Sequence, residues 1–382
     1  MIELAVTLLL AYSNRANDNF KGVATLYGSG VLNYRQAQLL STLATVTGAL
    51  GAVALTEALL KAFSGRGLVP NSVVDDPAFA ASVALAAGLT VALATRIGMP
   101  ISTTHALIGG LVGAGAMAAA SALNLSSLTQ QFVAPLLLGP IIAFVIAALL
   151  AAWQRRFWAA SAADESCASV IAPDYAPAGQ AAHASAIASL AAFAPTASPH
   201  AMLPRVALGT TEGECAPLVQ SGQTLVLTES RAINAAHIVS AAGMCFARGL
   251  NDVPKIAALL LVAKSVGASL SIASVALAMA LGGWLHSRRI AETMSHHIVK
   301  LEPRSSFLAH LCTAGLVISA SKYGLPLSTT HVSVGAISGL SIGGQNLSTA
   351  TLKQIGLSWL ATLPCAAIIG ALTYTLLKNF LC

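Results

Sequence analysis

Two short stretches of this 382-residue chain carry hydroxyl and imidazole groups in the same order. "GMPISTTHALIGG" covers residues 98–110, and "GLPLSTTHVSVG" covers residues 324–335. In each, a Gly-x-Pro break precedes Ser-Thr-Thr-His; proline suits the first turn of a helix, and serine or threonine caps it. Free backbone N–H groups, a positive helix end and hydroxyls together form an anion site. The candidate ligands are Ser102, Thr103, Thr104, Ser328, Thr329 and Thr330.

A second pair of matching stretches lies upstream of the hydroxyl motifs. "RANDNFKGVA" (15–24) and "GLNDVPKIAA" (249–258) share Asn-Asp and a lysine three residues further on. Acidic side chains within apolar membrane segments are costly and therefore mark functional sites. Beside an amide and freed backbone carbonyls, Asp18 and Asp252 form a hard-oxygen site that suits Na⁺ or a proton. They are the candidate cation-coupling residues.

Several of these side chains also have plainer interpretations. The histidine of each hydroxyl motif acts on substrate or protons, or else forms a structural bond to a carbonyl. The lysine of each Asn-Asp motif attracts substrate, or else snorkels toward the membrane surface. These residues are His105, His331, Lys21 and Lys255. The competing interpretation of either aspartate is a structural ion pair with Arg15 or Arg248.

The composition indicates a protein that faces lipid. Hydrophobic residues make up 56% of the chain and charged residues only 9%, whereas soluble domains carry about 25% charged residues. Apolar runs long enough to cross a bilayer recur at 78–95, 133–152, 266–285 and 355–377. We therefore predict an all-α polytopic membrane protein.

Charge and cysteine usage exclude other classes. The net charge of +6 comes from dispersed basic residues without a basic-aromatic surface, which excludes nucleic acid as a partner. The six cysteines have no CxxC or CxH spacing, so neither a disulfide framework nor a metal site is indicated.

The chain divides into two membrane halves joined by a linker, with boundaries at 1–158, 159–230 and 231–382. Ala, Pro, Ser and Thr dominate the linker, so we expect it to be flexible; it could include a short helix near 181–193. The basic-aromatic cluster "WQRRFW" (153–158) indicates that the linker lies in the cytoplasm. The basic stretch at 286–304 is expected on the same side.

Both motifs occur in both halves in the same order, so the halves are copies of one membrane unit. An anion site beside a cation site, built twice, is the design of a secondary symporter whose discontinuous helices meet near the bilayer midplane. Inverted repeats of this kind require an odd number of crossings in each half, whereas a re-entrant hairpin gives the first half an even number, and hydropathy does not distinguish the two.

The motifs resemble the signatures of the inorganic phosphate transporter family. "NRANDNFKGVATLYGSG" (14–30) and "FARGLNDVPKIAALLL" (246–261) are similar to the two copies of a signature written around G-A-N-D-V-A-N. The two hydroxyl motifs look like its P-[VI]-S-T-T-H-x-x-x-G elements, and residues 290–311 resemble the segment before the second one. The resemblance covers both membrane halves but not residues 159–230.

This resemblance implies a Na⁺- or H⁺-coupled importer of inorganic phosphate in the cell (inner) membrane, and no enzyme. It implies inverted repeats with broken helices, re-entrant hairpins and about 10–12 membrane segments, often as a homodimer, with no cofactor beyond the coupling ion. By the same resemblance the six hydroxyls hold phosphate at the hairpin tips. The central ion and substrate site is lined by Asn17, Asp18, Asn251 and Asp252.

The chain departs from the family pattern at four places. Arg15 stands where the family has glycine, and Phe20 or Lys21 replaces an asparagine. Two glutamates typical of the family are missing, one near Thr45 and the other at His310. Coupling through protons at His310 therefore competes with coupling through Na⁺.

Three other functions compete with a phosphate symporter. A permease for sulfate or another tetrahedral oxyanion fits the same hydroxyl-and-dipole site, and an anion channel fits paired broken helices. An intramembrane hydrolase would use Ser102 or Ser328 with the histidine three residues later, but no third group orients that pair.

Overall fold

The computed structural model describes residues 2–158, 167–171, 205–209, 224–262, 267–295, 302–342 and 349–381. They belong to two compact units. The larger, here called the membrane unit, combines residues 1–156 with residues 234–382, and the smaller comprises residues 157–233.

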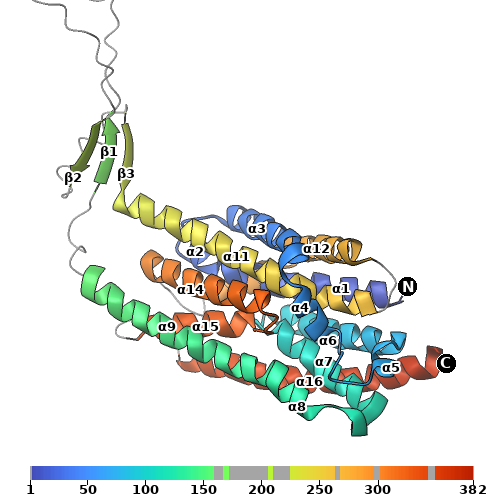
Figure 1. The fold of residues 1–382 in the computed structure, drawn as a ribbon. Coiled ribbons are helices and arrows are strands. Elements are labelled where there is room, and N and C mark those ends of the chain that lie inside the picture. The colour runs from blue at the N-terminus through green and yellow to red at the C-terminus, as the bar shows by residue number, and fades with distance from the viewer. Residues whose placement is uncertain are drawn as a thin grey trace, which may run out of the picture. The chain divides into compact units, whose positions relative to one another are not determined.

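The membrane unit is built of α-helices, shown in Figure 1. The first half contributes α1 (Ile2–Asp18), α2 (Ala24–Gly28), α3 (Tyr34–Leu55), α4 (Glu57–Phe63), α5 (Asn71–Val74), α6 (Pro77–Ile97), α7 (Thr103–Ala119), α8 (Leu125–Ser127) and α9 (Ala134–Trp158). The second half contributes α11 (Glu229–Val262), α12 (Ala268–Leu285), α13 (Arg288–Thr293), α14 (Pro303–Lys322), α15 (Thr329–Leu340) and α16 (Thr349–Leu381). The predicted all-α membrane architecture is confirmed for this unit.

The smaller unit contains a three-stranded antiparallel sheet that the sequence analysis did not anticipate. Its strands are β1 (Cys167–Ile171), β2 (Arg205–Gly209) and β3 (Thr224–Thr228), in the order β2-β1-β3. Each strand is a short run with β-branched residues, which favour extended backbone. The Ala- and Pro-rich composition around them conceals these runs. The short helix suggested near 181–193 lies outside the described residues.

Four helices in the described part of the chain are long and apolar enough to cross a membrane. They cover Pro77–Ile97, Thr103–Ala122, Leu125–Phe157 and Gly356–Asn379. A fifth span results if the bent pair Tyr34–Ala52 and Glu57–Phe63 is counted as one. Other long helices, notably α1, α11 and α14, carry charged and polar residues that lower their mean hydropathy. The larger number of segments expected from the sequence stays a prediction.

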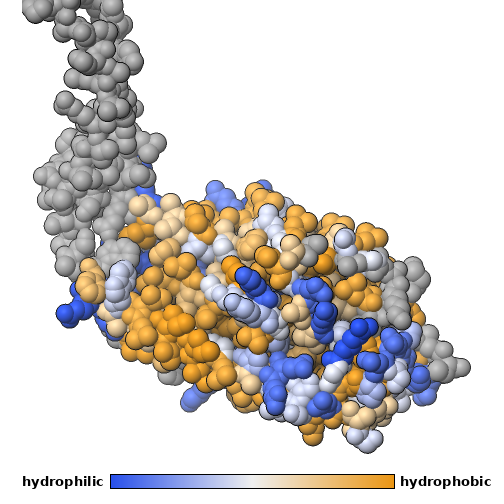
Figure 2. Space-filling model, viewed as in Figure 1, coloured by the Kyte–Doolittle hydropathy of each residue, from blue (hydrophilic) through white to orange (hydrophobic). Residues whose placement is uncertain are grey.

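The outer surface of the membrane unit is apolar. Large hydrophobic side chains project from α9 and α16, with Leu149 66% exposed and Leu360 75% exposed. Orange, hydrophobic residues cover much of the visible face in Figure 2. Such a surface is stable against lipid tails rather than water.

The two halves exchange their last helices. α16 packs along α7, and a Cβ added at Gly113 would collide with the backbone of Ala367. In the same way, a Cβ at Gly335 of α15 would collide with the backbone of Pro140 in α9. Small residues allow such close helix approach in membranes. Each half therefore completes the packing of the other half's hydroxyl-motif helix.

The ends of the two halves are distributed as inverted repeats require. Figure 1 shows the N- and C-termini at one end of the membrane unit, and the linker ends of α9 and α11 at the other end. Each half thus begins and finishes at opposite ends, which fits an odd number of crossings. The inverted orientation of the two halves stays a prediction.

A polar contact joins the start of α6 to the end of α16. The Asp76 carboxylate caps α6 by accepting from the Ala78 N–H, and it also accepts from the Tyr374 hydroxyl and the Lys378 ammonium, each at 3.0 Å. Burial raises the pKa of Asp76, but the hydrogen bonds from these three groups outweigh burial and hold that pKa below its ordinary value. This contribution to stability is present above the unfolded-state pKa and is lost as pH falls through the folded-state pKa.

We predict that Asp76→Ala lowers the melting temperature of the detergent-solubilised protein at neutral pH, because loss of a helix cap costs about 0.5–2 kcal/mol. The difference from wild type should begin to shrink below about pH 4, where aspartate becomes protonated in the unfolded chain, and should vanish only below the lower folded-state pKa of Asp76. Glu57→Ala is the control, because Glu57 pairs with Lys61 on the surface and is 82% exposed. Equal melting of Asp76→Ala and wild type at neutral pH would contradict the prediction.

Candidate functional site

The Gly-x-Pro breaks are tight turns between two helices. α6 ends at Ile97 and is followed by Gly98 in the left-handed conformation, with φ of 80°. α14 ends at Lys322, and Gly324 has a φ of 70°. Glycine adopts this conformation without steric cost, so both turns can form at the same position of the motif.

Serine caps the helix that follows each turn. Ser102 precedes α7 and accepts a hydrogen bond from the His105 N–H at 3.3 Å. Ser328 precedes α15 and accepts from the His331 N–H, also at 3.3 Å. The predicted helix N-termini are confirmed at both motifs. Both helix starts lie inside the membrane unit.

Asparagine holds each turn against its Asn-Asp motif. The Asn17 amide donates to the Met99 carbonyl at 2.9 Å and accepts from the Ile101 N–H at 3.1 Å. The Asn251 amide donates to the Leu327 carbonyl at 3.3 Å. Asn17 and Asn251 are both fully buried. Each Asn-Asp motif is therefore bonded to the Gly-x-Pro turn of its own half.

The local backbone differs between the two Asn-Asp motifs. In the first half, α1 ends at Asp18 and continues as a 3₁₀ turn over Asn19–Gly22. In the second half, α11 continues past Asp252 although Pro254 removes one backbone donor. The helix therefore ends at the Asn-Asp motif in the first half, whereas α11 runs through it in the second half.

Lys21 lies between the Asn-Asp motifs and the starts of α7 and α15, a region called the buried centre from here on. Its ammonium group forms an ion pair with Asp18 and donates to the Ile101 carbonyl at 2.6 Å and to the Thr330 hydroxyl at 3.2 Å. The lysine side chain is only 1% exposed. One partner, Thr330, belongs to the other half of the chain.

Lys255 makes the corresponding contacts with the halves exchanged. Its ammonium group donates to the Leu327 carbonyl at 2.7 Å and to the Thr104 hydroxyl at 2.8 Å, and it lies 3.7 Å from the Asp252 carboxylate. Ile101 and Leu327 occupy the same position in the two motifs, as do Thr330 and Thr104. The interpretation of the lysines as snorkelling residues is wrong, because both ammonium groups are enclosed by protein.

The remaining threonines of the hydroxyl motifs are buried at the same centre. Thr103 is 6% exposed and donates to the Asn14 amide oxygen. Thr329 is 4% exposed. The structure thus brings all six predicted hydroxyl residues together at the start of α7 and α15.

The two motif histidines stack on one another. The rings of His105 and His331 are nearly parallel, with centroids 4.4 Å apart. Each Nδ1 lies within hydrogen-bonding distance of its capping serine, at 3.0 Å for Ser102 and 2.5 Å for Ser328. The structural bond considered for these histidines is therefore made to a serine hydroxyl rather than to a carbonyl. A role toward substrate or protons stays a prediction.

The centre carries an excess of positive charge. Six charged residues of the described part of the chain are at most 4% exposed, four of them cationic and two of them anionic. Arg248 lies 3.5 Å from Asp18, which realises one of the ion pairs considered for that carboxylate. Buried ions require compensation by opposite charge or by hydrogen bonds. The six residues are Arg15, Lys21, Arg248, Lys255, Asp18 and Asp252.

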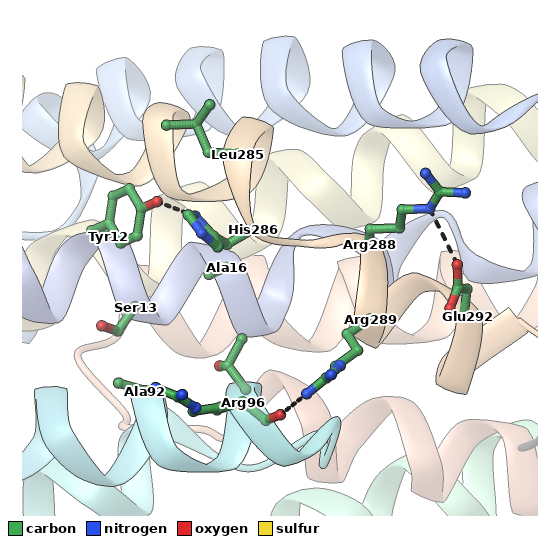
Figure 3. A pocket seen from close by; sticks show the side chains of 11 residues that line it. Tyr12, Ser13, Ala16, Ala92, Arg96, Leu285, His286, Arg288, Arg289 and Glu292 are labelled. Carbon is green, nitrogen blue, oxygen red and sulfur yellow. Dashed lines mark hydrogen bonds and ion pairs between the residues drawn. The ribbon is translucent and has the colours of Figure 1, made fainter.

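A cavity of about 650 Å³ is lined by residues of α1, α6, α12 and α13; Figure 3 shows its lining side chains. Its lining is rich in basic groups, with Arg288 paired to Glu292 at 3.2 Å and Arg289 donating to the main chain of Arg96. Thr95 also lines the cavity, and its hydroxyl accepts a hydrogen bond from the Asn17 amide at 3.1 Å. The cavity therefore reaches the wall of the buried centre.

The chain matches the model of the phosphate transporter family over residues 14–370. The chain belongs to this family. Its members are transporters and not enzymes, and the described spans place the chain in a membrane.

Proteins named as phosphate transporters or permeases are similar along nearly the whole chain. Inorganic phosphate transporter 2-1 of Arabidopsis thaliana chloroplasts is 28% identical and covers 96% of this chain and 70% of its own length. A putative phosphate permease of Chlamydia muridarum is 28% identical, covering 97% and 96%, and one of Pyrococcus abyssi is 26% identical, covering 99% and 97%. A solved structure titled as the sodium-dependent phosphate transporter has a TM-score of 0.75 at 20% identity, covering 99% and 98% of the two chains, and shares the fold.

Two departures from the phosphate transporter family pattern touch each other. Arg15 donates to the Thr45 hydroxyl and also to the Ser41 hydroxyl, the latter at 2.7 Å. By the resemblance of the motifs, the arginine stands where the family signature has glycine, and the threonine lies near the position expected for a glutamate. Sequence reasoning did not include Arg15 or Arg248 in the site, although both flank the Asn-Asp motifs.

A third departure, at His310, brings in one residue that sequence reasoning missed, His237. His310 and His237 both lie within hydrogen-bonding distance of the Thr25 hydroxyl, at 3.3 Å and 2.9 Å. Their ring centroids are 5.3 Å apart, and both side chains are buried. The signal available in the sequence was that His237 is a single histidine within an apolar stretch of α11.

We predict that Thr104→Val and Thr330→Val weaken phosphate binding by the purified protein to a similar extent. Each change removes a hydroxyl that accepts from a buried ammonium, and hydrogen bonds to charged groups contribute about 1.5–3 kcal/mol, or roughly tenfold or more in affinity. Thr90→Val is the matched control, because the buried Thr90 hydroxyl donates to the Ala86 carbonyl of its own helix. Wild-type affinity in either motif variant would contradict the assignment.

Proposed function

We propose that this chain imports inorganic phosphate across the cytoplasmic membrane as a cation-coupled symporter. The observation that carries the proposal is the buried centre, where four cations face two carboxylates at the starts of two helices. A tetrahedral oxyanion would supply the missing negative charge and accept hydrogen bonds from hydroxyl, ammonium and backbone N–H groups. The family membership and the names of the similar proteins support phosphate as that anion.

The proposed residue roles follow the motifs. Six hydroxyls at the tips of the two hairpins bind the oxyanion, together with Asn17 and Asn251. Asp18 and Asp252 set the charge that couples transport to cation flow. His310, with its neighbour His237, is the proposed carrier if the coupling ion is a proton, because both rings share the Thr25 hydroxyl.

The orientation proposed from the sequence determines which side of the membrane the cavity faces. With the linker and the basic stretch at 286–304 in the cytoplasm, Arg288 and Arg289 line a cavity that faces the cytoplasm. Phosphate leaving the centre would then pass a basic vestibule. A homodimer remains part of the proposal from the resemblance alone.

Sulfate or another tetrahedral oxyanion is the second candidate substrate. The centre recognises its ligand by hydroxyls, helix dipoles and ammonium groups, and these donors suit any compact oxyanion. Competition of labelled phosphate uptake by unlabelled sulfate, arsenate and phosphate ranks the three directly.

We predict that proteoliposomes containing the purified protein accumulate radiolabelled phosphate above its external concentration when a cation gradient is imposed. Uptake is measured with a Na⁺ gradient, a pH gradient, both gradients or neither. Asp18→Asn should abolish accumulation, because Asp18 holds both Lys21 and Arg248. Lys61→Ala, on the exposed surface, is the control.

Two outcomes would overturn this function. Downhill flux without accumulation under every gradient would identify a channel. Accumulation in Asp18→Asn at the wild-type rate would remove the carboxylate from the coupling mechanism.

A further inference from the structure

Each buried lysine ammonium group lies close to three oxygen atoms of the protein. The Lys21 ammonium contacts a carboxylate, a turn carbonyl at 2.6 Å and a threonine hydroxyl at 3.2 Å. The Lys255 ammonium contacts a turn carbonyl at 2.7 Å, a threonine hydroxyl at 2.8 Å and a carboxylate at 3.7 Å. The same three kinds of oxygen therefore surround both ammonium groups, in positions that correspond between the halves.

Carboxylate, carbonyl and hydroxyl oxygens are also the partners that an alkali cation takes in a membrane protein, where unwound carbonyls and half-helix ends coordinate Na⁺. An ammonium group is a compact point charge with three donors, so it satisfies three such oxygens at once. A Na⁺ ion and the lysine Nζ would thus compete for the same oxygens.

We propose that Lys21 and Lys255 are tethered cations that fill the two positions next to Asp18 and Asp252 where a coupling metal ion would otherwise bind. Phosphate transport by this chain then requires no Na⁺ at either carboxylate. This inference rests on the proposed function and narrows its coupling ion to the proton.

The surrounding charges support this assignment. Asp18 is contacted by Arg248 at 3.5 Å in addition to Lys21, so its two oxygens already face two cations. The buried charged side chains of the described residues already include four cations and two anions. A further metal cation would be repelled by this excess, and repulsion between charges is strong where water is excluded.

Unlike a free ion, each lysine ammonium is covalently part of one half of the chain and contacts residues of both halves. Lys21 contacts Ile101 of its own half and Thr330 of the other, and Lys255 contacts Leu327 and Thr104 in the same manner. A covalently held charge stays in the centre after substrate leaves. It therefore keeps the two hairpin tips connected when no diffusible cation is present.

The first test measures cation binding without transport. Purified wild type and the double variant Lys21→Ala/Lys255→Ala are melted in detergent with NaCl or with choline chloride at equal ionic strength. We expect the melting temperature of wild type to be the same in both salts and that of the double variant to be higher in NaCl. Lys61→Ala, an exposed lysine, is the control and should behave as wild type.

The second test measures transport in proteoliposomes under a fixed pH gradient. Wild-type phosphate uptake should be equal in Na⁺ and choline, and phosphate should drive no entry of ²²Na⁺. In Lys21→Ala, uptake in choline should fall about tenfold or more, because a buried carboxylate loses a charged partner, and Na⁺ or methylammonium should restore part of it.

The outcomes separate this inference from the proposed function. Na⁺-specific stabilisation of wild type, or phosphate-driven entry of ²²Na⁺, overturns the tethered-cation assignment while phosphate transport stands. Absence of Na⁺-specific stabilisation in a double variant that remains monodisperse also overturns it. Absence of phosphate uptake by wild type under every gradient overturns the proposed function, and the melting experiment still decides whether the lysines fill the cation positions.

Discussion

Two ammonium groups held inside a lipid-facing protein are the constraint on which the rest of the structure depends. An ammonium group buried at this depth is not hydrated, so each of its N–H donors needs an oxygen of the protein as acceptor. The nearest oxygens are the carbonyls of Ile101 and Leu327, which are free because a helix has stopped and the next has not begun. The left-handed glycines, the capping serines and the buried asparagines all serve to keep those turns open at the right position.

Because the membrane unit is duplicated, the same lysine contacts occur twice, once from each half. Each lysine bonds to its own half through a carbonyl and to the other half through a threonine, so two identical cross-links join the hairpin tips. A transported oxyanion offers the same ammonium groups a stronger acceptor than a neutral hydroxyl. In the proposed function, the substrate would therefore compete with the two threonines for the ammonium donors that connect the halves.

The sequence predicted what local rules decide. Helix starts at Ser102 and Ser328 follow from capping and proline chemistry, and their pairing followed from repetition. It did not predict the partners of Lys21, because Ile101 and Thr330 are 80 and 309 residues away. Arg15 and Thr45 were noticed separately as departures, and only the fold shows that they touch. The sheet formed by β1, β2 and β3 was missed because five-residue strands vanish within an Ala- and Pro-rich average.

The exchange of α9 and α16 between the halves has a consequence for biogenesis. The glycine face of α7 is closed by residues 363–367 of α16, which are synthesised only after the linker and most of the second half. Until then the first half presents an unfilled groove to lipid, although its own helices are complete. Neither half alone completes the packing of its own hydroxyl-motif helix, so translation must reach α16 before the first motif acquires its final surroundings.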